Sequence, residues 1–422
     1  MTRIALVSSE PLKARMAGIG IRYVELARRL PAWGIAPVLI SPAEPAEVPA
    51  TELPTADVRR FDPARLGELL ADCRGAVCQG QLANDVLLAR PDLPVAIDLY
   101  DPWLVENLHY AKTLGYGPYQ NDHATWMLQL SRGDFFLCSS EEQRLYYLGL
   151  LTALGRVNPD RLAADPDLAG LIAPVPFGLP GELPTYEPLL PPRTPGEWRI
   201  LFGGLYDWYD PWTLLEALEG LELPGGRRPV VLFIRNPNPD STPQRLFSEV
   251  EAFCRKRGTW GTLVQALDWI PSARRYDLLR EVDVLVSPHR PSLETRLSLR
   301  TRYLDALAAG CPVISTAGGT VARLLDHHGA GRVVPPGEPR ELAAALIAMA
   351  GTGGAEFRAG AAAVVESFAW ERALAPLVAF CRDPRQDATK ATFAFAPGTR
   401  TPADGLAFRL RRRLRRLLGG AA

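Results

Sequence analysis

The sequence predicts an α/β protein with two doubly wound domains that face each other across a cleft. Through the first 180 residues, short apolar runs typical of buried strands alternate with helical patterns. The segment 179–198, LPGELPTYEPLLPPRTPGEW, is rich in proline and has no hydrophobic period, which indicates a linker. After it, the alternation of strands and helices restarts. A chain of 422 residues, 47% hydrophobic and 22% charged, fits domains that each bury a core.

In the first domain, residues 1–180, we expect buried strands at residues 3–8, 37–41, 75–79, 95–99, 134–139 and 175–177. Helices are expected over residues 21–30 and 140–154. The second helix has Ser140 at its start and two glutamates in its first turn, which suits a helix N-terminus.

A Pro-rich linker over 181–198 leads to the second domain, 199–366. Its expected strands are residues 199–202, 229–234, 263–266, 282–287, 312–316 and 332–334. Helices are expected over 298–309 and from Thr320 onward. Residues 367–384 predict a late helix, interrupted near Pro376, which we expect to pack back on the first domain. Residues 385–422 predict a flexible tail.

The distribution of charge excludes one class of partner. The formal net charge is zero, but the tail holds nine basic and two acidic residues and so carries about +7 against −7 elsewhere. No basic field covers the main body, so nucleic acid is not an expected partner. Residues 405–418, GLAFRLRRRLRRLL, place leucines at helical spacing opposite arginines, the pattern of a basic amphipathic helix on an anionic membrane. A solvated tail, or a tail docked on the acidic body, fits the same residues.

The six cysteines show neither CxxC nor Cys/His ligand spacing, so we expect buried, reduced thiols. The opening residues MTRIALVSSEP lack the apolar core of a signal peptide, and no apolar run reaches the length of a membrane span. These observations predict a cytoplasmic protein, with peripheral contact at the inner membrane face through the tail.

The segment 287–319 is the strongest candidate for a functional site. Ligands of an open parallel sheet lie beyond the carboxyl ends of its strands, and this segment holds two such ends around one helix start. Guanidinium groups suited to phosphate and carboxylates suited to sugar hydroxyls surround that start: Glu294, Arg296, Arg300, Arg302 and Asp305. The combination indicates a nucleotide-sugar site.

Several motifs occur in the order found in one enzyme family. They are AGIGIRYVELARRL, DLYDP, PVPFGLP, ILFGGLYDWYDPWTLLEAL and ETRLSLRTRYLDALAAGCPVIST. Together, over residues 3–380, they resemble a family-4-type, hexosyltransferase-like glycosyltransferase of the GT-B fold, in a bacterial subgroup with DLYDP and E-T-R-x-S-x-R-T-R-x-L-D. The resemblance implies sugar transfer from an NDP-sugar, with retention of configuration and with neither cofactor nor bound metal. The implied acceptor is a cell-surface polysaccharide or a lipid-linked glycan precursor.

The resemblance also implies roles for the two carboxylates of the ETR block. Asp305 stands where the family has the second carboxylate of its Glu-x7-Glu motif, which holds the nucleotide ribose. Glu294 is the nearest candidate for the first, which touches the donor sugar, although ten residues lie between the two. A carboxylate that flanks a helix and pairs with an arginine is the alternative for each.

The family clamps the donor diphosphate with an Arg and a Lys after the first strand of the second domain. Here that loop, 203–210, has no basic residue. We expect one or two of Arg296, Arg300 and Arg302 to supply the missing charge, because an unpaired buried dianion is very costly. Arg300 and Arg302 differ by two positions and cannot share one helical face, so one of them could instead be exposed or paired with a carboxylate.

In the first domain, Asp98 and Asp101 end a predicted strand at the cleft. With Glu294 they are the catalytic candidates, able to bond the donor sugar or to stabilise oxocarbenium-like charge. Asp101 precedes a proline and could equally form a turn. Gly18 and Gly20 would let the backbone approach the donor, and plain turn glycines fit as well.

The remaining donor-binding candidates lie in second-domain loops: Gly204, Tyr206, Asp207, His289, Gly319 and Thr320. The aromatic and acidic ones suit a base or a sugar. His289 could bond phosphate or be structural, and Thr320 could be only an N-cap. No Asp-x-Asp or His/Cys cluster suggests a metal. A non-catalytic GT-B subunit and a NAD-dependent oxidoreductase are the alternative functions, although the expected acid after the second strand and the glycine spacing of the latter are missing.

Overall fold

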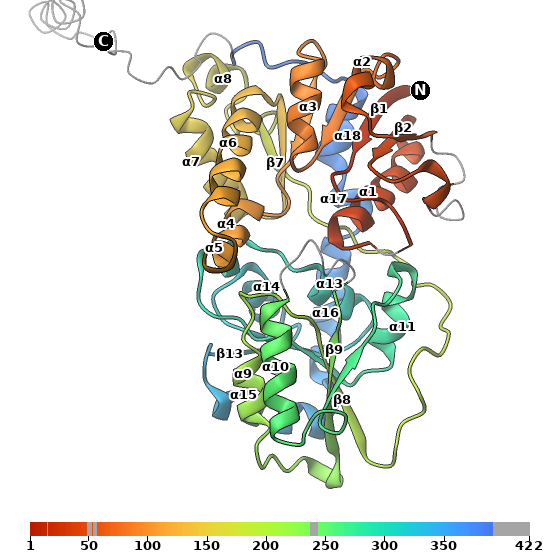
Figure 1. Cartoon of the computed structure of the whole chain (residues 1–422), viewed down its shortest axis with the longest axis vertical. Helices are drawn as coiled ribbons and strands as arrows, with labels where there is room; N and C mark the ends of the chain where they lie inside the picture. The colour runs from red at the N-terminus through yellow and green to blue at the C-terminus, as the bar shows by residue number, and fades with distance from the viewer. Residues whose placement is uncertain (15, 49–52, 54–56, 237–243, 391–422) are drawn as a thin grey trace, which may run out of the picture.

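The computed structural model describes residues 1–390 except 15, 49–52, 54–56 and 237–243. It contains two parallel sheets, one in each of two lobes stacked along the long axis of the molecule (Figure 1). The first sheet has the order β3-β2-β1-β4-β5-β6-β7 and the second the order β10-β9-β8-β11-β12-β13. In each sheet the chain builds outward in one direction from its first strand, β1 or β8, and then returns to build in the other direction. The prediction of two doubly wound sheets is therefore confirmed.

The strands of the first lobe are β1 Thr2–Val7, β2 Ile35–Ser41, β3 Asp57–Arg60, β4 Gly75–Cys78, β5 Val95–Asp98, β6 Phe135–Cys138 and β7 Ile172–Pro174. Those of the second lobe are β8 Glu197–Gly204, β9 Arg228–Ile234, β10 Val264–Leu267, β11 Val284–Val286, β12 Val313–Thr316 and β13 Arg332–Val334. The central strands β4, β5 and β6 are buried along their whole length because helices cover both faces of the sheet.

The helices of the first lobe are α1 Gly18–Arg29, α2 Leu66–Leu69, α3 Leu82–Ala89, α4 Trp103–Asn107, α5 Ala111–Leu114, α6 Gly117–Arg132, α7 Glu141–Ala153 and α8 Pro159–Ala164. Those that follow are α9 Pro211–Ala217, α10 Arg245–Lys256, α11 Arg275–Arg280, α12 Leu293–Leu297, α13 Thr301–Ala308, α14 Thr320–His328, α15 Pro339–Thr352, α16 Arg358–Ser367, α17 Trp370–Ala373 and α18 Ala375–Arg382. A side-chain cap opens α7 at Ser140, where the sequence predicts a helix start, and another opens α9 at Asp210.

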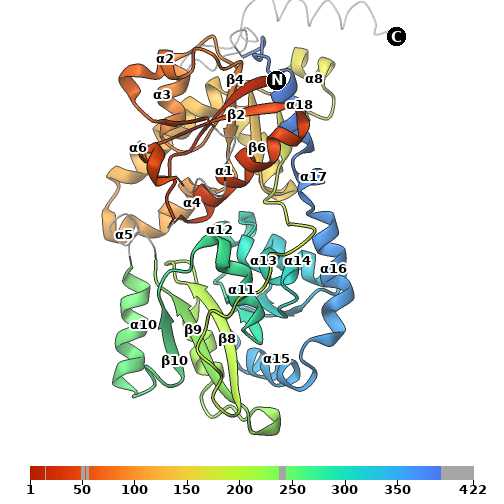
Figure 2. The ribbon, with the colours of Figure 1, turned by 90° about the vertical axis from the view of Figure 1, so that its right-hand side faces the viewer.

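Helices divide between the two faces of each sheet, as the views in Figures 1 and 2 show. In the first lobe, α1 and α18 share one core with the sheet, and α3, α6 and α7 share the other. In the second lobe, α9, α10 and α15 cover one face and α11, α13, α14 and α16 the opposite one. All six cysteines are buried and unpaired, which confirms that prediction.

The chain crosses between the lobes twice. After β7 it runs through the proline-rich segment into β8, and after α16 it returns so that α17 and α18 join the core of the first lobe (Figure 2). The two crossings touch, because the Leu179 amide donates to the Phe368 carbonyl at 2.7 Å. Beyond α18, Asp387 forms a fully buried ion pair with Arg156 at 2.9 Å, so the chain stays attached to the first lobe.

Three sequence predictions need correction. The last strand of the first sheet is Ile172–Pro174, three positions before the predicted 175–177. Strand β3 was not predicted, because its four residues are polar and only partly buried. The segment before residue 298, where no helix was expected, contains α12, and the following helix begins at Thr301 rather than at residue 298.

Candidate functional site

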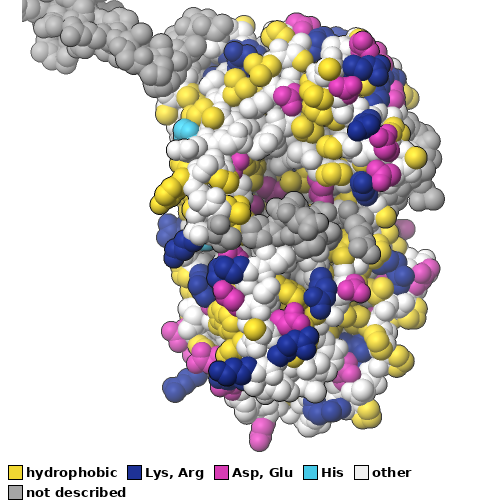
Figure 3. Space-filling view, viewed as in Figure 1, with side chains coloured by type: hydrophobic (Ala, Val, Ile, Leu, Met, Phe, Trp, Pro, Cys, Tyr) yellow, Lys and Arg dark blue, Asp and Glu magenta, His cyan; other side chains and the backbone are white. Residues whose placement is uncertain are grey.

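A cavity of about 450 Å³ lies between the lobes, in the recess visible in Figure 3. The first lobe contributes the start of α1, the end of β5, and the segment from α4 to α6. The second lobe contributes the loop after β8 and the connection between α12 and α13. Its polar lining residues include Gln79, Asp98, Asp101, Glu106, Asn107, Glu294, Arg300 and Arg302. We call it the central cavity.

A second cavity of about 250 Å³ adjoins it at the carboxyl end of the second sheet. Its described lining is largely apolar and includes Trp269 and Ile270, and the charged groups among these described residues are Asp305, Arg275 and Arg302. We call it the side cavity. Both cavities are lined by Ala17, Gly18, Tyr206, Thr301 and Arg302, so they meet at these residues.

Arg302 lies at this junction and is held at the end of β8. Its Nη1 donates to the carbonyls of Phe202 and Gly204 at 3.0 and 3.1 Å and to the Ser287 hydroxyl at 3.2 Å. Gly203 makes room for it, since a Cβ there would lie 2.9 Å from Arg302 Nη1 and its φ is +87°. The guanidinium therefore brings a positive charge to the loop after β8, which has no base of its own.

Arg300 lies in the central cavity on a fixed support. Its Nη2 contacts Glu294 Oε2 at 2.6 Å, and its Nε donates to His289 Nε2. Burial, then the charges of Arg300 and Arg302, hold the pKa of His289 well below its ordinary value, so the ring is a neutral acceptor. His289 orients Arg300 and lines neither cavity, so of the two roles that the sequence leaves open for it, a phosphate contact or a structural one, the geometry favours the structural role.

The other arginine predictions are corrected by where α13 begins. Arg300 is the N-cap of α13 and Arg302 is its second residue, so the rule for helix faces does not separate them and both line the central cavity. Arg296 is instead exposed on α12 and lines neither cavity.

Of the two aspartates at the end of β5, one is structural and one faces the central cavity. Asp98 is fully buried, and its carboxylate binds the Arg22 guanidinium through Nε at 2.7 Å and Nη2 at 3.3 Å. Arg22 also donates to the Val175 carbonyl at 2.8 Å, so this pair ties α1, β5 and the end of β7 together. Asp98 lines the central cavity, but both of its oxygens already bind Arg22, so it supports the cavity wall and is less free than Asp101 to meet a ligand.

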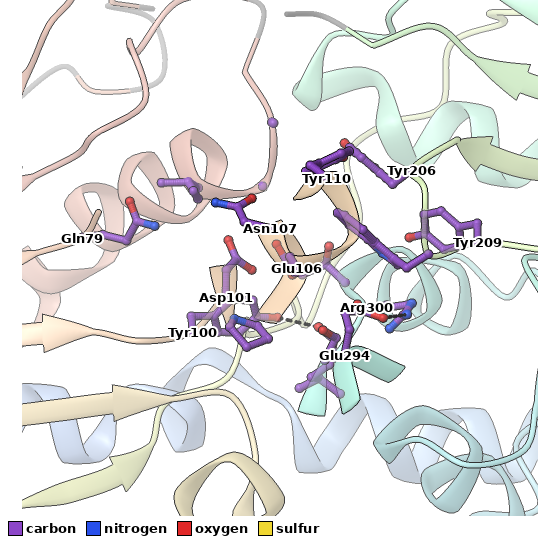
Figure 4. A pocket seen from close by; sticks show the side chains of 18 of the residues that line it. Gln79, Tyr100, Asp101, Glu106, Asn107, Tyr110, Tyr206, Tyr209, Glu294 and Arg300 are labelled. Atoms are coloured by element: carbon purple, nitrogen blue, oxygen red, sulfur yellow. Dashed lines mark hydrogen bonds and ion pairs between the residues drawn. The ribbon is translucent and has the colours of Figure 1, made fainter. Parts of the chain in front are cut away.

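Asp101 and Glu106 point into the central cavity with Asn107 (Figure 4). Burial and the carboxylates of Asp98, Glu10 and Glu294 raise the pKa of Asp101 to about 7. Burial and the carboxylates of Asp101 and Glu294 raise the pKa of Glu106 well above its ordinary value. Such crowding of carboxylates suits a site where positive charge develops during a reaction.

Of the two candidate glycines at the start of α1, one lines the cavities and the other is buried beneath it. Gly18 lines both cavities, and nothing lies within 4 Å of the place a Cβ would take. Gly20 is buried beneath it, and its amide donates to Glu10 Oε2 at 2.7 Å, while the Ala17 amide donates to Oε1 at 2.6 Å. The amide of Gly20 is therefore already used, which corrects its expected contact with the donor.

In the loop after β8, Gly204 lines the side cavity and Tyr206 lines both cavities. The Tyr206 ring stacks on Trp208 with centroids 5.0 Å apart. Asp207 lines neither cavity, because it is buried against Arg245, with Nη2 and Oδ2 3.0 Å apart. Its expected contact with the donor is thereby corrected.

The Gly319–Thr320 loop joins the lobes instead of lining a cavity. The Thr320 hydroxyl donates to Glu142 Oε2 of α7 at 3.1 Å, and Arg323 pairs with the same carboxylate at 2.5 Å. Gly319 packs on α12, where a Cβ would lie 2.5 Å from the Thr295 carbonyl oxygen. Gly319, rather than Thr320, is the N-cap of α14.

Several cavity residues escaped the sequence analysis. Glu106, Asn107 and Tyr110 follow DLYDP in a helix too short to show a period, although their place just beyond a strand end is a usable signal. Arg275 lines the side cavity from α11, which no motif marked.

In the described part of the chain, no group of three or more His, Cys, Asp or Glu side chains is placed to hold a metal ion. Nor is any helix described there long and apolar enough to cross a membrane. The predicted amphipathic helix, 405–418, lies outside the described residues.

Residues 237–351 match the family model described as "Glycosyl transferases group 1". No curated protein matches the chain at the level of sequence. Solved structures match its fold. The fold is GT-B.

The Anabaena protein HepE in complex with UDP-glucose has 14% sequence identity and a TM-score of 0.64, with 90% of this chain and 98% of that chain covered. Sucrose-phosphate synthase from Thermosynechococcus elongatus has 16% identity and a TM-score of 0.61 at the same coverage. WaaG, a glycosyltransferase involved in lipopolysaccharide biosynthesis, has 14% identity and a TM-score of 0.55, again with 90% and 98% covered. At these identities the likeness concerns the GT-B fold.

Proposed function

We propose that the protein is a family-4-type glycosyltransferase that moves a sugar from an NDP-sugar to an acceptor hydroxyl. The observation that carries this proposal is the position of Arg302. It lies where the largely apolar side cavity, which contains the carboxylate of Asp305, meets a polar cavity rich in carboxylates. A nucleoside suits the side cavity, a diphosphate suits the junction at Arg302, and a sugar suits the central cavity, which is the order of these groups in an NDP-sugar.

In the proposed donor complex, the base lies against Trp269 and Ile270, and Asp305 bonds the ribose. The diphosphate lies at the junction, close to Gly18 and the guanidinium of Arg302, which replaces the loop Arg and Lys of the resembled family. Bidentate recognition of phosphate by arginine suits this placement. The similarity of the fold to that of HepE, whose structure was solved in complex with UDP-glucose, supports a nucleotide sugar as the ligand.

The sugar then occupies the central cavity beside Arg300, Glu294 and Asp101. As the bond between its anomeric carbon and the β-phosphate oxygen breaks, the acceptor oxygen bonds that carbon, the acceptor proton passes to the departing phosphate, and NDP leaves. The carboxylates stabilise the oxocarbenium-like charge, and Arg302 stabilises the phosphate. Attack from the face that the phosphate leaves gives retention, and no metal is required.

The acceptor enters, we propose, over the segment between α4 and α6. Leu114 and Tyr119 of this segment line the central cavity, and Leu114 and Tyr116 are 50% and 77% exposed. An apolar rim beside a polar cavity fits a lipid-linked glycan precursor, or the sugar face of a polysaccharide. A cytoplasmic enzyme held at the inner membrane face by its basic tail would meet such an acceptor.

Calorimetry with UDP, ADP and GDP tests the donor site. We expect Arg302→Ala and Asp305→Ala each to weaken binding of the best NDP, the arginine change by about 1.5–3 kcal/mol because its hydrogen bond is charge-assisted. Arg296→Ala, an exposed arginine of the same block outside both cavities, is the matched control and should bind as wild type does.

Thermal unfolding of each variant establishes that it is folded. Equal NDP affinity in wild type and both cavity variants would show that the donor lies elsewhere. Turnover of NDP-sugar by the purified protein separates an enzyme from a non-catalytic GT-B subunit, for which the base-free loop 203–210 is the argument.

A further inference from the structure

The carboxylate of Asp305 is held through only one of its two oxygens. The Tyr276 hydroxyl donates to Oδ1 at 2.8 Å, and Arg275 Nε approaches the same oxygen at 3.4 Å. Arg275 Nη2 also donates to the Tyr276 hydroxyl at 3.2 Å, and its Nη1 donates to the Ser272 carbonyl at 2.9 Å. The two α11 side chains thus fix each other as well as Asp305.

The second oxygen, Oδ2, has no hydrogen-bond partner among the described residues. The Asp305 side chain is only 10% exposed, and it lines the side cavity. This oxygen is not fully enclosed by the protein, so a ligand in the side cavity can donate a hydrogen bond to it. Oδ1 is occupied, so that donor has to reach Oδ2.

We propose that Tyr276 and Arg275 are positioning residues that make Asp305 recognise a single ribose hydroxyl through Oδ2. This inference rests on the proposed function, because it takes the side cavity to hold the nucleoside. A free carboxylate can accept from both hydroxyls of a ribose diol, one on each oxygen. Here Oδ1 already accepts from the Tyr276 hydroxyl and from Arg275 Nε, so the ribose hydroxyl at Oδ2 is bound strongly and the other weakly.

The alternative is that the Tyr276–Asp305–Arg275 contacts only stabilise the packing of α11 on α13. Burial and the neighbouring Asp305 carboxylate raise the pKa of the Tyr276 phenol, so it remains a hydrogen-bond donor at neutral pH under either interpretation. The difference lies in the ligand. Only if Tyr276 positions Asp305 for the ligand does the difference in affinity between the two ribose hydroxyls depend on Tyr276.

The experiment compares three ligands on three proteins by calorimetry. UDP, ADP and GDP are titrated first, and the tightest is then used with its 2′-deoxy and 3′-deoxy analogues. The proteins are wild type, Tyr276→Phe and Tyr147→Phe. Tyr147 is a matched control, because its buried hydroxyl also donates one hydrogen bond, to the Leu99 carbonyl at 3.1 Å, and it lies outside both cavities.

In wild type and Tyr147→Phe we expect the dissociation constants of the two deoxy analogues to differ by about tenfold, the value of one charge-assisted hydrogen bond. In Tyr276→Phe that ratio should shrink to about threefold or less, because Oδ1 becomes free to accept the second hydroxyl.

Two results would overturn the inference alone: a wild-type ratio near one, or a ratio that Tyr276→Phe leaves unchanged. Absence of NDP binding by wild type would overturn the proposed function, and the inference with it. A loss of stability in Tyr276→Phe does not imitate the expected result, since the ratio compares two ligands on one folded protein.

Discussion

Asp101 offers the sharpest test of the electrostatics of the central cavity. Its pKa is raised from an ordinary 3.8 to about 7, first by burial and then by neighbouring carboxylates. The folded protein therefore holds this proton over a range where the unfolded chain has released it. Between about pH 4 and pH 7 the free energy of unfolding falls as pH rises, and the loss is complete above the folded pKa.

The pKa difference sets the size of the effect. From 3.8 to about 7 it corresponds to a ceiling of about 4 kcal/mol. The side chain is only half-buried, so we expect about 2 kcal/mol after screening by water. Asp101→Asn cannot ionise and should escape this loss. Relative to wild type, the free energy of unfolding of the variant should rise by that amount between about pH 4 and pH 8, most of it above pH 5. The substitution also lowers the pKa of Glu106, because it removes a neighbouring carboxylate.

Urea unfolding at several pH values measures the free energy of unfolding of variant and wild type. In the difference between the two, the titration of groups that both proteins share cancels. Asp268→Asn is the control, because this side chain is 98% exposed and lines neither cavity. A difference for Asp101→Asn that stays constant from pH 5 to pH 8 would refute the reasoning.

Two further predictions concern the metal and the tail. Sugar transfer should continue undiminished in excess EDTA, because Arg302 supplies the charge on the diphosphate; loss of activity that Mg²⁺ or Mn²⁺ restores would contradict this. Full-length protein should float with anionic liposomes at low salt and less at high salt, whereas a chain ending at Lys390 should not, and equal flotation would remove the tail from the mechanism. Lys390 is the right end point because Asp387 and Lys390 bind Arg156 and Asp134 in the first lobe.

The sequence predicted most of the fold because the relevant signals are local. The fully buried strands β4, β5 and β6 show as continuous apolar runs, and Ser140 and Asp210 mark helix starts by their side-chain chemistry. The five residues of α12 are too few to show a period, so only the cap at Ser292 distinguishes this helix from a loop.

The site was predicted less completely, because tertiary partners decide what a polar side chain can do. Asp98 pairs with Arg22, 76 positions away, and Asp207 with Arg245, 38 positions away. No local pattern distinguishes these bound aspartates from Asp101, which faces the cavity. The sequence does not distinguish Arg302 from the other two arginines proposed for the diphosphate. Only the structure shows that its guanidinium packs against Gly203 at the end of β8.

The touching crossings between the lobes have a mechanical consequence. Leu179 of the outgoing crossing is hydrogen-bonded to Phe368 of the returning one, and Gly178 lies so close to Trp370 that a Cβ would fall 2.3 Å from its ring. The two connections thus act as one pivot rather than two independent hinges. A rotation of the lobes about this pivot would move the α5 side furthest (Figure 2) and would change the width of the central cavity at Leu114 while the pivot stays packed. Any bulkier residue at Gly178 would stiffen or displace that axis without touching a ligand.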